Sequence, residues 1–407
     1  MGIISDLFKK LKIKWSPSYY GYTARSSPWS LEAWEHDIFR SAVDTIATYV
    51  AKGQARHVII DPEGRVKETK YNSRESRIIN EKPNAFMSGF DLKYRLISQL
   101  ETKTTAIAYM DYEGGKLQAI YPVDYQNFEF RKVRGEARYA IEYTDIEGET
   151  AYLNLEDCIV IRKFYLNNQV AGDGNAPIYR VLDMAKASDE GLIEALAVSN
   201  KVRGLVKNTK AMLDPDDIKK SQADFAKRFA DAAKNGGILA IDSMEDFKEL
   251  YASTLTMNAA QMKEISNRIY SYLRISEKVI QNTYTETEGL AFMEGRIEPL
   301  WQQLAEAFTN ALFTKHEREC GNRIIFSGGI MTGTSIQTRV QVLSATKETG
   351  ELTTNERREL LGFAPVADGD QRQISLNYVK NTDQTSYQTG KQTEVENPNE
   401  EGNSDVE

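Results

Sequence analysis

The feature that most constrains this chain is an apolar stripe of helical spacing toward its C-terminal end. From Gly289 to His316, apolar side chains recur at three- and four-residue steps: Leu290, Met293, Ile297, Leu300, Leu304, Phe308 and Leu312. Such a stripe needs an apolar partner surface. Pro299 lacks an amide hydrogen and Gly295 lies four residues before it, so the sequence predicts a kink at 295–299. An ordinary core helix that contains a proline would show the same pattern.

A polar segment precedes this helix and carries little positive charge. Between 276 and 288 the one basic residue is Lys278, against the acids Glu277, Glu286 and Glu288. The hydroxyl side chains of the segment are Ser276, Thr283, Tyr284, Thr285 and Thr287. This composition predicts an exposed loop between two helices. A solvated linker that binds no ligand is equally consistent with it.

The hydrophobic period changes along the chain and separates helical from β regions. Helical spacing predicts helices over 30–52, 88–101, 182–207, 215–233, 257–274, 289–316 and 334–347, with a short one beginning near Thr354. Alternating or continuous apolar runs predict strands over 56–60, 105–112, 117–121, 127–133, 137–143, 158–164, 237–241, 246–251 and 323–326. Hairpin turns join strands between 105 and 164, so this region is expected to be mostly antiparallel. The predicted fold class is α+β.

The charge of the chain is concentrated at its end. Of the formal net charge of -8, residues 381–407 carry -6, and the remaining 380 residues are nearly neutral. The tail is poor in apolar residues and is predicted to be disordered. Positive charge gathers in Lys201, Arg203, Lys207 and Lys210 on a predicted helix. These four could line a channel or pair with acids of a neighbouring chain, although a solvated helix face is the usual explanation of such a run.

A catalytic or metal-binding constellation is not recognisable in the sequence. His36, His57 and His316 have no second histidine or cysteine at ligand spacing, and neither Cys158 nor Cys320 has a CxxC neighbour. Both cysteines are expected to be buried or half-buried thiols. We therefore predict no catalytic residues, no metal and no cofactor. No apolar run approaches the roughly 20 residues that a membrane helix needs, so no membrane contact is expected.

Several stretches resemble, in the same order along the chain, segments of tailed-bacteriophage portal proteins of the siphovirus-like, long-tailed type. The most specific, at 261–313, is QMKEISNRIYSYLRISEKVIQNTYTETEGLAFMEGRIEPLWQQLAEAFTNALF: an amphipathic helix, a polar segment and a long helix with a proline in mid-course. The others are GDGNAPIYRVLD at 172–183, NGGILAID at 235–242, and GELTTNERRELLGFAPVADGD at 350–370. One departure is Arg274-Ile275-Ser276, where relatives often have Val-Pro.

The resemblance implies a portal fold with a mixed α/β wing, a helical stem, a small α/β clip, a kinked tunnel helix and a short helical crown. The implied parts are an N-terminal arm (1–24), the first part of the wing (25–185), a stem helix (186–210), the clip (211–256), a second stem helix (257–274), the tunnel loop (275–288), the kinked helix with the second part of the wing (289–347), the crown (348–380) and the acidic tail (381–407).

The function implied by the resemblance is that of a non-enzymatic, dodecameric ring at one capsid vertex, assembled in the host cytoplasm and retained in the virion. Double-stranded DNA would pass through it without sequence recognition, and Thr283, Tyr284, Thr285, Glu286 and Thr287 would face the channel. Hydroxyl groups can touch phosphates without the salt-dependent grip of lysine or arginine. The implied partners are the large terminase, a head-tail adaptor, the major capsid protein and the scaffolding protein.

Two alternatives belong to other functional classes. One is a helical adaptor protein that never encloses DNA. The other is a hydrolase or transferase built from scattered carboxylates around Asp61 or Asp242, although both residues are more simply explained as turn or surface acids. The oligomeric state separates the portal from the adaptor, and a substrate-dependent activity lost with a single carboxylate would identify the enzyme.

Overall fold

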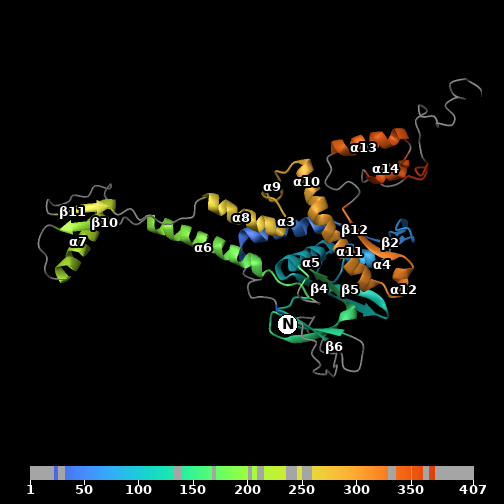
Figure 1. Ribbon diagram of the computed structural model, residues 1–407, viewed down its shortest axis with the longest axis horizontal. Helices are drawn as coiled ribbons and strands as arrows, with labels where there is room; N and C mark the ends of the chain where they lie inside the picture. The colour runs from blue at the N-terminus through green and yellow to red at the C-terminus, as the bar shows by residue number, and fades with distance from the viewer. Residues whose placement is uncertain are drawn as a thin grey trace, which may run out of the picture.

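The computed structural model describes most of the chain in eleven ranges. These are residues 23–25, 33–132, 139–166, 171–199, 204–208, 215–234, 245–249, 259–328, 336–349, 351–360 and 366–371. Within them, helices and sheets form a mixed body, and the paired helices α6 and α8 lead from this body toward a small unit made of α7, β10 and β11 (Figure 1). The mixed helix-and-sheet class predicted from the sequence is confirmed.

The helices are amphipathic segments joined by capped turns. The described α-helices are α3 Asp37–Ala51, α4 Arg74–Asn80, α5 Gly89–Lys103, α6 Ala176–Ser199, α7 Pro215–Lys234, α8 Ala259–Leu273, α9 Glu277–Ile280, α10 Glu286–Phe292, α11 Glu298–Leu312, α12 Lys315–Glu319, α13 Ile336–Thr349 and α14 Thr354–Leu360. A 3₁₀ turn, η1, spans Leu155–Asp157, and a π-helical turn, η2, spans Met293–Ile297.

The strands form small antiparallel sheets. The described strands are β1 Thr23–Arg25, β2 Gln54–Ile60, β3 Val66–Lys70, β4 Thr105–Glu113, β5 Lys116–Pro122, β6 Asn127–Lys132, β7 Tyr139–Thr144, β8 Thr150–Asn154, β9 Cys158–Arg162, β10 Gly204–Asn208, β11 Glu245–Glu249 and β12 Asn322–Ser327. Their orders are β1-β6-β7-β8, β5-β4-β9, β12-β2-β3 and β10-β11. The antiparallel region expected between 105 and 164 is confirmed.

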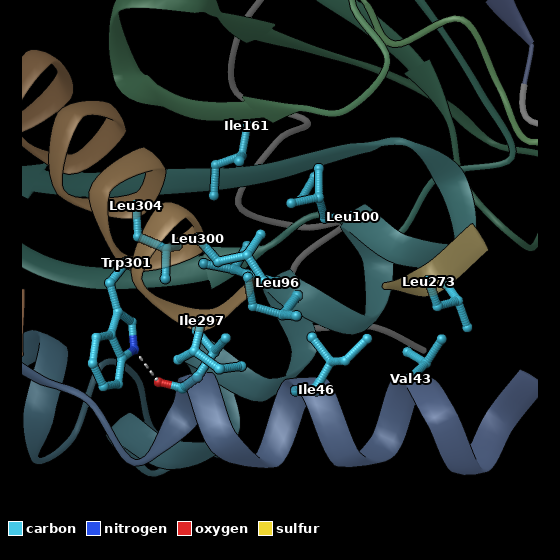
Figure 2. Packing of buried hydrophobic residues seen from close by; sticks show 14 of the residues in the cluster. Val43, Ile46, Leu96, Leu100, Ile161, Leu273, Ile297, Leu300, Trp301 and Leu304 are labelled. Atoms are coloured by element: carbon cyan, nitrogen blue, oxygen red, sulfur yellow. Dashed lines mark hydrogen bonds between the residues drawn. The ribbon is translucent and has the colours of Figure 1, made fainter. Parts of the chain in front are cut away.

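One apolar layer joins segments from both ends of the sequence. The stripe of α11 packs on β9 and β12, and the neighbouring helices α3 and α5 pack against each other. Figure 2 shows the side chains that meet here: Val43, Ile46, Leu96, Leu100, Ile161, Leu273, Ile297, Leu300, Trp301 and Leu304. Each fully buried aliphatic side chain contributes about 1.5–3 kcal/mol. This layer therefore holds the described body together.

A close contact fixes how α11 sits on the end of α3. The indole nitrogen of Trp301 donates a hydrogen bond to the carbonyl oxygen of Val50, 3.0 Å away (Figure 2). Gly53 lies directly against the indole, because a Cβ atom at that position would come within 2.5 Å of the ring nitrogen. Because Gly53 has no side chain, Trp301 of α11 can pack this closely on the end of α3.

The sheet β12-β2-β3 depends on a pairing between residues far apart in sequence. Residues 54–59 of β2 pair with residues 322–327 of β12 in antiparallel register. Thr309 of α11 supports β12, since its hydroxyl accepts a hydrogen bond from the Ile324 amide and lies within donating distance of the Ile324 carbonyl. The strand predicted at 323–326 is confirmed as part of β12.

The motif T-x-N-E at 353–356 is the start of α14. Thr353 and Glu356 form a reciprocal cap, in which each side chain accepts a hydrogen bond from the other residue's amide. The Asn355 side chain accepts from the Val366 amide and donates to the Val366 carbonyl and to Asp370. Gly369 packs against Asn355 so closely that a Cβ atom would lie 2.1 Å from the amide oxygen. This motif therefore caps α14 and attaches its first turn to residues 366–370.

Several element boundaries differ from the predictions. The helix expected over 182–207 begins at Ala176 and ends at Ser199, and strand β10 occupies 204–208. The helical prediction was wrong there because β10 pairs with β11, a partner about forty residues away. The elements β3, α4 and β8 were missed. The strand predicted at 237–241 and the acidic tail lie outside the described residues.

A buried lysine marks the junction of α3 and α5. Lys93 is 1% exposed, and its ammonium group donates to the Gly53 carbonyl at 2.5 Å. Burial lowers the pKa of Lys93 to about 8, from an ordinary value of 10.5. Because the pKa is lowered in the folded chain, the burial penalty is fully present below pH 8. It is relieved as the pH rises from 8 to 10.5, where the folded chain releases its proton first.

Replacing Lys93 by methionine is expected to stabilise the chain at pH 7 by about 2 kcal/mol. Removing the buried charge stabilises the chain by about 3 kcal/mol, as judged from the pKa shift. Losing the hydrogen bond to Gly53 costs about 1 kcal/mol of this gain. Urea unfolding from pH 7 to 10.5 measures the difference, which should shrink and then reverse. The exposed Lys82→Met is the control and should show no such trend. A gain that is constant with pH would contradict the ionisation argument.

Candidate functional site

The segment predicted to be a polar loop is largely ordered. We call residues 275–288 the loop segment. It leaves α8 through Arg274, whose φ is 55°, and contains the short helix α9 and the first turn of α10. Ile275 and Val279 are buried and hold it against the body. The expectation of an irregular loop was therefore wrong for 277–280 and 286–288.

A glutamate closes the loop segment on itself. Glu288 accepts hydrogen bonds from the Lys278 ammonium at 2.5 Å, from the Thr285 amide at 2.9 Å and from the Thr285 hydroxyl at 3.1 Å. The hydrogen bond from Lys278, more than the contacts from Thr285, lowers the pKa of Glu288 to about 2. The one lysine of the segment is thus neutralised by a carboxylate of the same segment.

Two of the five predicted channel residues are engaged by the body of the protein. Tyr284 is half-buried, its hydroxyl lies 2.8 Å from the Tyr49 hydroxyl of α3, and its ring packs against Gly289. Burial and the neighbouring Tyr284 hydroxyl raise the pKa of Tyr49 to about 12. Thr285 is the N-terminal cap of α10, and its hydroxyl accepts a hydrogen bond from the Glu288 amide. Their local roles are therefore anchoring and capping.

The remaining residues of this set differ in exposure. Thr283 and Thr287 are exposed, and so is the Thr285 side chain despite its capping bond. Glu286 is half-buried in the first turn of α10. The exposed residues of the segment are Ser276, Glu277, Lys278, Gln281, Asn282, Thr283, Thr285 and Thr287, of which Glu277 and Lys278 are charged. A role for these side chains at DNA remains a prediction.

The long helix is interrupted by a π-helical turn next to the position where the sequence predicts a kink, and the kink itself stays a prediction. The π-helical turn Met293–Ile297 separates α10 from α11, and Pro299 lies in the first turn of α11. Met293 and Ile297, at the two ends of the π turn, are both buried. The turn is therefore packed into the apolar core at both of its ends.

A buried ion cluster lies beside the π turn. The Glu101 carboxylate is fully buried and accepts from the Arg296 guanidinium with one oxygen and from the Lys163 ammonium with the other. Burial lowers the pKa of Lys163, and the Glu101 carboxylate opposes this shift. Asn175 donates to the Glu101 and Thr102 carbonyls. The cluster thus joins α5, the end of β9 and the π turn.

Sequence reasoning missed this cluster. Glu101 and Arg296 are separated by 195 positions, and each resembles an ordinary surface charge of an amphipathic helix. The one available signal was that Arg296 lies three residues after Met293 and four before Leu300 of the apolar stripe, which places it near the buried face of the helix. Its partner could not be identified without the tertiary structure.

The four predicted basic residues are not brought together on a helix. Lys207 lies on strand β10, opposite Asp246 of β11 in the register. Its assignment to a stem helix was wrong, because the helix ends at Ser199. Lys201, Arg203 and Lys210 lie outside the described residues. A shared channel-lining face of these residues therefore stays a prediction.

The residues considered for other chemistry have structural explanations. Asp61 closes the β2–β3 turn, where its carboxylate accepts from the Arg65 amide at 2.7 Å. His57 is buried, and its Nε2 lies 2.9 Å from the Asn322 side-chain oxygen. Cys158 is buried as expected, whereas Cys320 is exposed. Asp242 lies outside the described residues.

The described residues contain no group of three or more His, Cys, Asp or Glu side chains arranged to hold a metal ion. In the same ranges, none of the helices combines the length and the apolar character required to cross a membrane.

The Tyr49–Tyr284 contact is expected to stabilise the chain cooperatively. Tyr49→Phe and Tyr284→Phe should each cost about 1 kcal/mol of unfolding free energy, because each leaves a half-buried hydroxyl without its partner. The double variant should cost less than the sum of the two. Denaturant unfolding of the three variants measures the coupling. If the two single losses of unfolding free energy simply add in the double variant, the two hydroxyls do not interact, which would contradict the contact. Tyr71→Phe, at a tyrosine that is 72% exposed, is the control.

Comparison with solved structures finds a similar fold in chains from particles of a gene transfer agent. The neck of an empty gene transfer agent (GTA) particle, computed with C6 symmetry, matches with a TM-score of 0.59 and 16% identity over 85% of this chain and 96% of that chain. The neck of a native GTA particle, computed with C12 symmetry, matches with a TM-score of 0.57, at the same identity and coverage. At this identity the likeness shows the fold alone.

Sequence comparison identifies the family. Probable portal proteins of Lactococcus phages p2 and SK1 are each 22% identical to this chain over 225 residues, which are 53% of this chain. The chain spans about half the length of these curated relatives, since the match covers 56% of each. The family model described as phage portal protein matches residues 37–362, from the start of α3 to just beyond α14. The chain therefore belongs to the phage portal protein family.

Proposed function

We propose that this chain is the subunit of a closed, non-enzymatic ring at one vertex of a phage capsid, through which double-stranded DNA is packaged and ejected. The observation that carries the proposal is the family match over residues 37–362. The C12 symmetry of the GTA neck, a protein of similar fold, supports a ring of twelve subunits. The likeness to a chain of the GTA virion supports a position in the virion. Assembly in the host cytoplasm is part of the proposal.

Uncovered apolar surface on α6 supports contact with a neighbouring subunit. Leu192 and Ile193 are 51% and 66% exposed on α6, the helix that packs against α8. Met184, earlier on the same helix, is 43% exposed. Apolar side chains gathered on one helix are costly in water and mark interaction surfaces. In a ring with rotational symmetry, each such surface is covered by a different surface of the next copy.

The composition of the loop segment supports a sliding contact with DNA. Its exposed side chains Thr283, Thr285 and Thr287 are uncharged, and Lys278 is held by Glu288. Each lysine or arginine bound to a phosphate displaces counterions and adds a salt-dependent grip. A segment without such free cations can touch a moving backbone through hydroxyl groups and release it readily.

The implied parts of the fold give the proposed docking sites. α6 and α8 correspond to the stem, and the unit of α7, β10 and β11 to the clip, so the clip begins at β10 rather than after residue 210. The body with α3, α5 and the β4–β9 region corresponds to the wing, and α14 to the crown. We assign the terminase and the head-tail adaptor to the clip end, and the capsid and scaffolding proteins to the wing.

The ring is tested by native mass measurement and by an axial electron-microscopy view of the full chain. A closed assembly of twelve subunits is expected, by analogy with the C12 neck. Leu192→Glu with Ile193→Glu should shift the mass toward monomer, because charge replaces apolar contact. Ile146→Glu, the same change at a hairpin turn, should leave the ring intact. A stable monomer or dimer of the unaltered chain at high concentration would refute the proposal.

The sliding contact is tested by adding positive charge to the loop segment. Thr283→Lys with Thr287→Lys should slow DNA packaging at low salt and recover toward the normal rate as salt rises from about 50 to 200 mM, since each added phosphate contact steepens the salt dependence. Thr150→Lys, on exposed β8, is the matched control. A packaging rate that is unaffected at every salt concentration, in rings that assemble normally, would remove DNA contact from this segment.

A further inference from the structure

The π turn between α10 and α11 is bound to the body of the protein by one of its own side chains, Arg296. Arg296 lies within this turn, and its side chain is 10% exposed. Its guanidinium group donates to the Glu101 carboxylate at the last turn of α5, which is fully buried. A buried carboxylate strongly favours a cation that remains in place. The turn is therefore attached to α5 by a charged contact that water does not weaken.

The second cation of the cluster offers a natural comparison. Lys163 binds the other oxygen of Glu101 from the residue after β9, and its side chain is 12% exposed. Lys163 also lies near the rings of Phe164 and Tyr272. Arg296 and Lys163 thus neutralise the same buried carboxylate from two directions, but Arg296 alone of the two belongs to the interrupted helix.

The π turn determines how α10 is rotated about the helix axis relative to α11. A π turn inserts about one extra residue relative to a regular α-helix. If the turn reverted to α-helix, everything before it would rotate by roughly 100° about the helix axis. A Cβ atom at Gly295 would have no neighbour within 4 Å, so apolar packing at that position does not hold the turn.

The orientation of α10 in turn places the loop segment. Phe292, the last residue of α10, meets the ring of Tyr49 edge-on, with centroids 5.4 Å apart. At the other end, Tyr284 packs on Gly289 and reaches the Tyr49 hydroxyl. Both contacts are made with the same residue of α3. A rotation of α10 by roughly 100° would break both at once.

We propose that Arg296 and Glu101 are positioning residues, whose ion pair holds the π turn and thereby fixes the loop segment against α3. The proposal rests on the proposed function in so far as that segment faces DNA. The contact would set where the threonine hydroxyls of every subunit lie around the channel. The position of the loop segment would then depend on the wing helix α5 through a single buried carboxylate, that of Glu101.

The test measures amide hydrogen exchange on assembled rings of the full chain. Arg296→Met should accelerate exchange at residues 286–292 by roughly tenfold or more, because the buried contact that orders the turn is lost. Lys163→Met removes the other partner of Glu101 and should leave these amides protected. Arg296→Lys keeps the charge and should restore most of the protection. Equal acceleration in the Arg296 and Lys163 variants, or none in either, would overturn the proposal.

A deletion keeps the test informative if Arg296→Met fails to assemble. Removing Gly295 takes one residue out of the π turn and allows a regular helix while the faces of α10 and α11 are retained. In that background, Arg296→Met should no longer alter exchange at residues 286–292. A persistent acceleration there would mean that Arg296 acts through general stability, which overturns the positioning role.

DNA packaging by the same rings separates this proposal from the proposed function. Accelerated exchange at residues 286–292 together with slower packaging supports both. Accelerated exchange with a normal packaging rate supports the positioning role and removes the loop segment from DNA transport. Unchanged exchange in Arg296→Met rings overturns the positioning role whatever the packaging rate is.

Discussion

The packing of α11 against the N-terminal half of the chain is the contact on which the rest of the structure depends. Its apolar stripe lies on β9 and β12, and Trp301 is bonded to the end of α3. Because the stripe and its partners are up to about 250 residues apart, the body closes only when both ends of the described chain are present. The loop segment lies just before this helix in the chain, so the packing of α11 also determines where the loop segment lies.

The loop segment combines local order with a weakly charged surface. The Lys278–Glu288 contact, the Thr285 cap and the Tyr284–Tyr49 bond each satisfy polar groups within the protein. What remains exposed is mostly uncharged. A contact with a moving polyanion needs this combination, because free cations would hold phosphates and an unstructured loop would lose its place in the ring.

Much of the fold was predictable because it rests on local patterns. The stripe of α11, the helix predicted over 88–101 and the antiparallel strands from Thr105 to Arg162 follow from periodicity and turn chemistry, and the structure confirms them. The errors lie where a distant partner overrides local preference. Gly204–Asn208 read as helix but pairs with β11, and the loop segment gained α9 because Val279 is buried against the body.

The sequence by itself determined the family and the α+β class, since both are written in short-range spacing and in the order of motifs. Only the tertiary structure decided that Tyr284 is an anchor, that Lys207 lies on a strand, and that Glu101 and Arg296 share a buried ion pair. The physical reason is that spacing specifies which face of an element is buried. The partner of a charged or hydroxyl side chain is set by chain closure over hundreds of residues.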